Sequence, residues 1–205
     1  MKELEKKIKE LMDSGVGIQA RKRIQEFSAF KNHSEKKWFS ELCFCLLTAN
    51  TSAEMGLRVQ KKVSAEKFLS LSEKKLSLEL KKAGSRFYNR RANFIYSARN
   101  LKVKKELKKI SSDKQRAFLA DNVKGFGLKE ASHFLRNTGC FDYAIIDKHV
   151  FNVSREFNLI KTEKLNKKTY FELEKKLLKL AGKLGISLGE LDLYLWFMKT
   201  GKILK

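Results

Sequence analysis

Apolar residues recur along this chain at the spacing of α-helices rather than in strict alternation. Two clear sets are Leu4, Ile8 and Leu11 near the N-terminus, and Tyr170, Leu173, Leu177 and Ala181 later in the chain. The short apolar run at 143–146 is the best candidate for a strand, but it fits a buried connection leading to Asp147 better. Since no clear period-2 segment lies between turns, the pattern predicts an all-α protein.

Polar residues and glycines mark the ends of several predicted helices. Ser34 can cap the start of the apolar helix that follows it. The segment Ser187–Glu190 has the form of a capping box, and Gly201 follows as a C-terminal stop. Gly84 would end the helix that begins near Ser72 in the same way.

The chain carries a strongly positive charge. Its 205 residues include 45 lysines and arginines but only 23 acidic residues, a formal net charge of +22. Many lysines, such as those at 104–109, fit ordinary solvated helix faces, but the imbalance favours a polyanionic partner bound in a salt-dependent way. No apolar stretch approaches the roughly 18 residues of a membrane span, and the N-terminus lacks the apolar segment of a signal peptide. We therefore expect a soluble, intracellular protein without a membrane partner.

The cysteines and histidines indicate neither a disulfide framework nor a metal centre. The three cysteines are an odd number, and Cys43 and Cys45 lie in an apolar segment where buried thiols are expected. The histidines His33, His133 and His149 show no ligand spacing, so a catalytic metal is not implied.

The segment 122–131, with the sequence NVKGFGLKEA, places two glycines before a predicted helix that starts at Leu128. Glycine lets the backbone approach a phosphate closely and adopt positive φ where needed. Backbone N–H groups at the helix N-terminus then form an anion site. Such a turn is weak evidence alone, because many are plain helix connections. With the basic composition, it predicts DNA binding through Lys124, Gly125 and Gly127.

Lys129 and Asp147 are the candidate catalytic residues. The amine of Lys129 could attack a sugar carbon once desolvation or a nearby base has made it neutral. Asp147 stands where a helix N-cap belongs, with lone pairs left to face positive charge on the sugar. Each residue also has an ordinary interpretation, as an exposed helix lysine and a simple capping aspartate. Their combination with the glycine turn indicates an enzyme that removes a damaged base from DNA.

Four further segments, in order along the chain, carry a resemblance to one enzyme family. They are ELCFCLLTANTSAE at 41–54, GSRFY at 84–88, KEASHFLRN at 129–137, and LDLYLW at 191–196 followed by Gly201 and Lys202. With the glycine turn and IDKHV at 146–150, they resemble the helix-hairpin-helix DNA glycosylase superfamily. Within it, they are most similar to the type-2 8-oxoguanine DNA glycosylase/lyases of archaea and some bacteria, and the match spans most of the chain.

The resemblance implies a two-domain helical body with damaged DNA in the cleft between the domains. The central domain would cover 33–147 and carry the helix-hairpin-helix near 115–138, while 1–32 would pack with 148–205. Lys129 matches the family's nucleophile and Schiff-base residue, and Asp147 matches its catalytic aspartate. The implied reaction is attack at C1′, release of the base, and β-elimination that breaks the strand 3′ to the lesion.

Five residues are candidates for contacts with the extruded base. Asp192 and Trp196 lie four positions apart, hence on one helix face, where the carboxylate could accept guanine N1–H and N2–H while the indole stacks. Phe87 and His133 could form other walls, and the resemblance places the C-terminal Lys205 near the base. The ordinary alternatives are core packing for the two aromatic residues and a surface or core polar role for the histidine and the aspartate.

The resemblance also bears on DNA insertion, cofactors and partners. Asn50 matches the position that fills the gap left by the flipped base, although it also fits an ordinary helix C-terminus. Several relatives hold an iron–sulfur cluster through four C-terminal cysteines, but the last cysteine here is Cys140, so no such cluster is expected. No cofactor is required, and a monovalent cation could bind hairpin carbonyls. The implied partner is double-stranded DNA containing 8-oxoguanine, bound by a monomer in the prokaryotic cytoplasm, at the nucleoid.

Two other functions stay open at this point. The chain could be a related glycosylase for another damaged base, such as thymine glycol or a mismatched base. It could also be a non-enzymatic helix-hairpin-helix module that only binds DNA. The pairing of Lys129 with Asp147 argues against the second, because simple binding requires neither residue.

Overall fold

The computed structural model describes residues 1–205, and every regular element in it is helical, which confirms the all-α prediction. The chain divides into two compact units. The continuous unit is Lys31–Thr138, and the terminal unit combines Met1–Phe30 with Gly139–Lys205. The sequence-based division placed 139–147 in the central domain, whereas here this stretch groups with the terminal helices.

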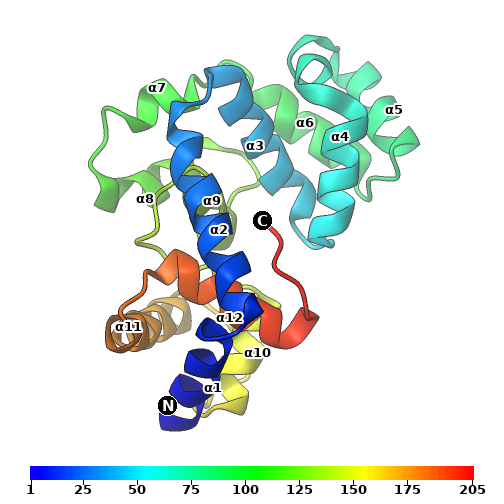
Figure 1. The fold of residues 1–205 in the computed structure, drawn as a ribbon. Helices are drawn as coiled ribbons and strands as arrows, with labels where there is room; N and C mark the ends of the chain where they lie inside the picture. The colour runs from blue at the N-terminus through cyan, green and yellow to red at the C-terminus, as the bar shows by residue number, and fades with distance from the viewer. The chain divides into compact units, whose positions relative to one another are not determined.

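The continuous unit is built around one buried helix. Its helices are α3 (Glu35–Thr48), α4 (Ala53–Ser70), α5 (Glu73–Lys82), α6 (Tyr88–Ala98), α7 (Val103–Leu107), α8 (Ser112–Asn122) and α9 (Leu128–Asn137) (Figure 1). Every α3 residue from Trp38 to Thr48 is buried, because apolar residues occupy nearly every side of this stretch. Helix α3 contacts α4, α6, α7 and α9, so the helix that carries Lys129 packs directly on the centre of the unit.

Buried polar contacts fix α9 against α3. The Asn137 side-chain amide donates to Glu41 Oε1 at 2.7 Å, and Arg136 Nη2 donates to Asn137 Oδ1 at 3.0 Å. All three residues are buried. Because a buried polar group left without a partner costs about 1–3 kcal/mol, these hydrogen bonds favour one register of α9 on α3.

The terminal unit has α12 at its centre. Its helices are α1 (Lys2–Met12), α2 (Gly15–Ala29), α10 (Lys148–Glu156), α11 (Lys167–Leu184) and α12 (Leu188–Thr200), and the short 3₁₀ helix η1 (Phe30–Asn32) lies at the junction with the continuous unit. Helix α12 contacts α1, α2, α10 and α11. The apolar positions predicted to face the core are buried at Leu4, Ile8, Tyr170, Leu173, Leu177 and Ala181. Leu11 is half-buried.

The predicted helix ends are confirmed where a local signal marked them. Ser34 and Ser187 are N-caps, and each accepts the backbone N–H of the residue three positions later, at 3.4 and 3.1 Å. Gly84 and Gly201 follow their helices with φ of 85° and 67°. These left-handed conformations are easy for glycine, which has no Cβ atom to clash with the following carbonyl.

The predictions for buried segments are also confirmed. Residues 143–146 form a buried connection without strand structure. Cys43 and Cys45 are fully buried and form no disulfide, and burial raises the pKa of the Cys43 thiol above its ordinary value. None of the helices is both long enough and apolar enough to cross a lipid bilayer.

Candidate active site

The turn between α8 and α9 is the predicted helix-hairpin-helix turn. Gly125 has φ of +94°, and a Cβ atom there would lie 2.3 Å from Cδ2 of Phe94, so this position is built for glycine. Gly127 has φ of −115°, which any residue adopts, and a Cβ atom there would approach only Glu130 Oε2, at 3.5 Å. Positive φ is therefore needed at one of the two glycines.

Apolar residues of this turn fix it to the protein. Val123 and Phe126 are buried, and the Phe126 ring lies 6.2 Å from that of Phe134 on α9. The residues predicted to bind the DNA backbone are exposed: Lys124, Gly125 and Gly127. Lys124 Nζ donates to Asn93 Oδ1 on α6 at 3.0 Å. The turn thus exposes its polar side to solvent, while the buried Val123 and Phe126 hold it against the rest of the unit.

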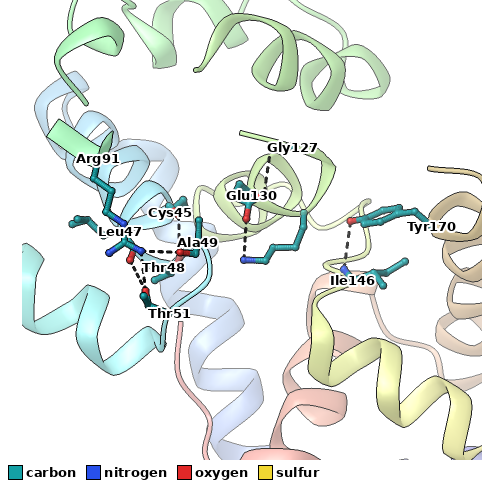
Figure 2. Close-up of polar contacts among 11 residues, drawn as sticks. Cys45, Leu47, Thr48, Ala49, Thr51, Arg91, Gly127, Glu130, Ile146 and Tyr170 are labelled. Carbon is teal, nitrogen blue, oxygen red and sulfur yellow. Dashed lines mark hydrogen bonds and ion pairs between the residues drawn. The ribbon is translucent and has the colours of Figure 1, made fainter. Parts of the chain in front are cut away.

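Lys129 lies in the first turn of α9, directly after the hairpin. Its side chain is 25% exposed, and its Nζ lies 3.3 Å from Glu130 Oε1. The other carboxylate oxygen of Glu130 accepts the Gly127 N–H at 3.3 Å (Figure 2). Glu130 therefore links the hairpin backbone to the lysine amine, a role that the sequence analysis did not assign to it.

Asp147 is the N-cap of α10 in the terminal unit. Its Oδ1 accepts the Val150 N–H at 2.8 Å, which confirms the predicted cap. One carboxylate oxygen thus anchors the side chain to the helix. Because only Oδ1 takes part in this bond, the capping role leaves Oδ2 with its lone pairs to act on another group.

Helix α11 holds the connection that leads to Asp147. The Tyr170 hydroxyl donates to the Ala144 carbonyl at 2.7 Å. It also accepts the Ile146 N–H at 3.4 Å (Figure 2). Glu174 accepts the Ala144 N–H at 2.9 Å. These bonds satisfy backbone groups of a buried connection that has no regular secondary structure, and they fix the backbone just before Asp147.

The terminal unit also contains three of the residues predicted to contact the base. Asp192 is 7% exposed and lies among Ile145, Val150 and Leu195. Trp196, one turn later on α12, is partly exposed, and its ring meets that of His149 edge-on at 6.3 Å. Lys205 is partly exposed beyond Gly201, which ends α12.

His133 lies one turn after Lys129 on α9. It is 8% exposed, and its ring packs edge-on against Phe44 of α3, with 5.7 Å between the ring centres. The packing agrees with the interpretation of this histidine as a core residue. It also fixes the ring one helical turn after Lys129.

Asn50 and Phe87 lie on exposed loops of the continuous unit, and both have left-handed backbone, with φ of 56° and 54°. The Phe87 side chain is 53% exposed, so the core-packing alternative is wrong for this residue. Asn50 comes just after Ala49, the C-cap residue of α3, as the helix-terminal interpretation also requires.

Arg91 joins these two loops and was missed by the sequence analysis. It is 3% exposed and donates hydrogen bonds to residues on both loops. A signal was present in the sequence: Ala92, Ile95 and Ala98 mark the buried face of α6, and Arg91 precedes Ile95 by one turn on that face. An arginine on an apolar helix face needs polar partners, which should have drawn attention to it.

Metal-ligating side chains do not gather in the structure. No group of three or more histidine, cysteine, aspartate or glutamate residues is arranged to hold a metal ion.

The chain matches a known protein family along most of its length. A family model described as 8-oxoguanine DNA glycosylase matches residues 20–186. Over 204 residues, the chain is 46% identical to the 8-oxoguanine DNA glycosylase/AP lyase of Methanocaldococcus jannaschii, and the match covers 98% of each protein.

Solved structures share the fold. The crystal structure of the Methanocaldococcus jannaschii 8-oxoguanine glycosylase/lyase in complex with a 15mer DNA containing 8-oxoguanine has a TM-score of 0.95 and 45% identity, over 98% of this chain and 99% of that one. The 8-oxoguanine DNA glycosylase of Thermotoga maritima has a TM-score of 0.90 and 39% identity, over 100% and 99% of the two chains.

Proposed function

Because the chain belongs to the 8-oxoguanine DNA glycosylase family, we propose that it removes 8-oxoguanine from double-stranded DNA and then cleaves the strand. The observation that carries this proposal is 46% identity to a glycosylase/AP lyase along 98% of both proteins. This similarity favours a bifunctional enzyme over a glycosylase for another base and over a non-enzymatic binding module. The net charge of +22 supports a DNA partner.

Lys129 is the proposed nucleophile. Its neutral Nζ would bond to C1′ while the C1′–N9 bond breaks, and the base would leave with that electron pair and take up a proton. Opening of the sugar ring would give an imine between Nζ and C1′. Loss of a proton from C2′ and departure of the 3′ oxygen with its phosphate would then break the strand. The partial exposure of Lys129 and its place in the first turn of α9, directly after the hairpin, support this role.

Asp147 would stabilise the positive charge that develops on the sugar. Its bond to the Val150 N–H fixes the carboxylate on the helix N-terminus, and the contacts of α11 to residues 144 and 146 hold the backbone before it. A charged group that needs no reorganisation during the reaction is the most effective kind of electrostatic catalyst.

The residues proposed to contact the base are Phe87 and His133 in the continuous unit, and Asp192, Trp196 and Lys205 in the terminal unit. The exposed ring of Phe87 and the partly exposed indole of Trp196 support stacking on the extruded base. His133 and Asp192 are largely buried, each in its own unit, so each would present only a small polar surface to the base. Asp192 would accept guanine N1–H and N2–H, and the C-terminal Lys205 would lie beside the base.

The proposed DNA contacts lie on exposed turns. Asn50 would enter the gap left by the flipped nucleotide, and the 124–127 turn would bind a backbone phosphate. Carbonyl oxygens of that turn are ligands suited to a monovalent cation. We further propose that the enzyme acts as a monomer in the prokaryotic cytoplasm, at the nucleoid, and requires neither an iron–sulfur cluster nor another cofactor.

Borohydride trapping tests the nucleophile. With a duplex that contains one 8-oxoguanine, borohydride should reduce the imine to a stable protein–DNA adduct. Lys129→Gln should abolish trapping and leave DNA binding largely intact, because glutamine has no nucleophilic amine. Lys114→Gln is a matched control, since Lys114 is an exposed lysine in the first turn of the neighbouring α8, and it should trap like the wild type. Undiminished trapping by Lys129→Gln would exclude Lys129 as the nucleophile.

A panel of lesion duplexes tests the base. The wild-type protein should release base and cleave the strand preferentially at 8-oxoguanine. Preferential cleavage at thymine glycol or another oxidised pyrimidine would contradict the guanine assignment. Salt-sensitive binding to every duplex without any base release would identify a non-enzymatic module.

A further inference from the structure

The guanidinium group of Arg91 is buried and bonds to two loops that are distant in sequence. Nη2 donates to the Ala49 carbonyl at 2.7 Å and lies 3.1 Å from Thr51 Oγ1, which also accepts (Figure 2). Nη1 donates to Ser85 Oγ at 3.0 Å. Because a guanidinium is planar and its N–H groups form a fixed fork, these bonds hold the two loops at a set distance and angle.

Each of the two loops carries one exposed residue in the left-handed region. Asn50 lies between Ala49 and Thr51, with φ of 56°. Phe87, with φ of 54°, follows Ser85 by two residues and is the N-cap residue of α6 without a side-chain cap. A bulky residue such as phenylalanine is rarely found in this conformation, which persists only when surrounding contacts impose it.

Contacts around Arg91 impose that conformation on Phe87. The Arg91 N–H donates to the Phe87 carbonyl at 3.0 Å, and the guanidinium carbon lies 5.9 Å from the centre of the Phe87 ring. The guanidinium carbon of Arg86 lies 5.1 Å from the same ring. The Ser85 hydroxyl, which accepts a hydrogen bond from Arg91, also donates one to the Arg86 carbonyl at 3.1 Å. The backbone bond is the ordinary first bond of α6, whereas the side chain of Arg91 contacts the Phe87 ring and holds Ser85, two residues before it.

The polar partners of Arg91 are neutral. They are one carbonyl and two hydroxyl groups, and burial together with the charge of Arg86 lowers the pKa of Arg91 to about 10. A buried cation that bonds only to neutral groups is a costly way to stabilise a fold, since an apolar side chain of similar size often serves as well. Its presence here favours a role in geometry rather than in stability alone.

We propose that Arg91 is a positioning residue that sets Asn50 and Phe87 at a fixed separation, so that both engage the DNA around one flipped nucleotide. This inference rests on the proposed function, in which Asn50 enters the gap left by the flipped nucleotide and Phe87 stacks on the extruded base. Because Arg91 is buried, this role requires no contact between its side chain and the DNA or the reacting atoms. It acts through the 49–51 turn and the 85–87 loop, which would otherwise move independently.

The test compares Arg91→Met with Arg99→Met. Arg99 is a matched control because it lies on the same helical segment, donates to the Phe68 carbonyl at 2.7 Å, and has its pKa lowered by burial, yet it contacts neither loop. The first measurement is single-turnover excision of 8-oxoguanine at saturating enzyme. The second is the fluorescence of 2-aminopurine placed next to the lesion, which rises when the neighbouring base leaves the stack. The third is borohydride trapping on single-stranded abasic DNA, which needs no base flipping.

Arg91→Met should slow excision by about 10- to 100-fold, because small misplacements of positioning groups have effects of this size. The 2-aminopurine signal should fall with it, while trapping on single-stranded abasic DNA stays at the wild-type level. Arg99→Met should match the wild type in all three measurements. Wild-type excision and fluorescence in Arg91→Met would overturn the inference, and so would equal losses in both variants.

A second pair of changes keeps the inference testable if Arg91→Met does not fold. Thr51→Val and Ser85→Ala each remove one hydroxyl that accepts from Arg91, on opposite loops. Ser85→Ala removes the hydrogen bond from the guanidinium to the 85–87 loop and should reduce the 2-aminopurine signal. Thr51→Val keeps the Ala49 carbonyl as a partner on its loop and should reduce the signal less, and the double variant should lose little more than Ser85→Ala. Wild-type signal in the double variant would contradict the proposal. If the wild type itself neither excised nor trapped, the proposed function would fail instead.

Discussion

Asp147 combines a structural role with a proposed chemical role in one side chain, and the two can be separated. Asparagine caps helices about as well as aspartate, so Asp147→Asn should change the free energy of unfolding by less than about 0.5 kcal/mol. The variant lacks the negative charge proposed to face the sugar. Single-turnover excision should therefore fall by about 10²- to 10³-fold, as expected for loss of a preorganised electrostatic group.

Asp147→Ala provides the comparison, because alanine removes both the cap and the charge. It should lose about 0.5–2 kcal/mol of stability, measured by denaturant unfolding, while its excision rate matches that of Asp147→Asn. A wild-type rate in Asp147→Asn would show that the residue is only a cap.

At the residue scale, roles that depend on neighbours a few residues away could be predicted from the sequence. The Asp147 cap could be predicted because its partner, Val150, is three residues away. Arg91 could not be assigned in the same way, since its partners Ala49 and Thr51 lie 42 and 40 residues earlier in the chain. The exposure of Phe87 was open for the same reason, because only its surroundings decide whether an aromatic ring is buried.

At the element scale, predicted helix ends succeeded where a serine or glycine marked them, as at Ser34 and Gly201. Other features gave no such signal. Helix α4 contains a break at Ser64, where φ is 66°, although neither glycine nor proline stands there. Tertiary packing can impose such conformations against local preference, and a sequence pattern does not record them.

The hairpin turn yields a prediction that separates its two glycines. Gly125→Ala should lose about 1–3 kcal/mol of stability, because alanine is strained at positive φ and its Cβ would displace the Phe94 ring. Gly127→Ala should lose less than about 1 kcal/mol, since its backbone suits any residue and glycine is only a moderate cap.

The DNA affinities of Gly125→Ala and Gly127→Ala should not follow the order of their stabilities. If a phosphate approaches both glycines, Gly127→Ala should weaken binding clearly despite its small effect on folding. Fluorescence anisotropy with a lesion duplex, together with thermal unfolding, makes the comparison. Wild-type affinity in Gly127→Ala would mean that the phosphate lies away from this glycine.

At the scale of the whole molecule, the charge of +22 predicts strong salt dependence. Each neutralised phosphate contributes about −0.9 to the slope of log affinity against log salt, and we expect a slope steeper than about −4. Lys124→Gln should make the slope less steep by about 1, because it removes one phosphate contact. Lys179→Gln on α11 changes the net charge equally and should leave the slope unchanged. Equal effects of the two variants would indicate diffuse attraction rather than a contact at the hairpin.

The fold class could be predicted for the whole molecule, since helical periodicity repeats along the entire chain. The boundary at 147 differs from the structure, where the continuous unit ends at Thr138. The residues from 139 to 147 carry no linker composition, and their grouping depends on bonds to Tyr170 and Glu174, more than twenty residues later.

The order of elements in the terminal unit has a consequence for biosynthesis. Helix α2 leaves the ribosome early, but one of its packing partners, α12, begins at Leu188 and is made much later. The first two helices therefore lack this part of their packing until α12 has been translated. The continuous unit is complete long before then and can fold during translation. Termination of translation before α12 should thus yield a folded continuous unit together with α1 and α2, whose apolar surface stays exposed. Quality-control proteases should degrade such a product.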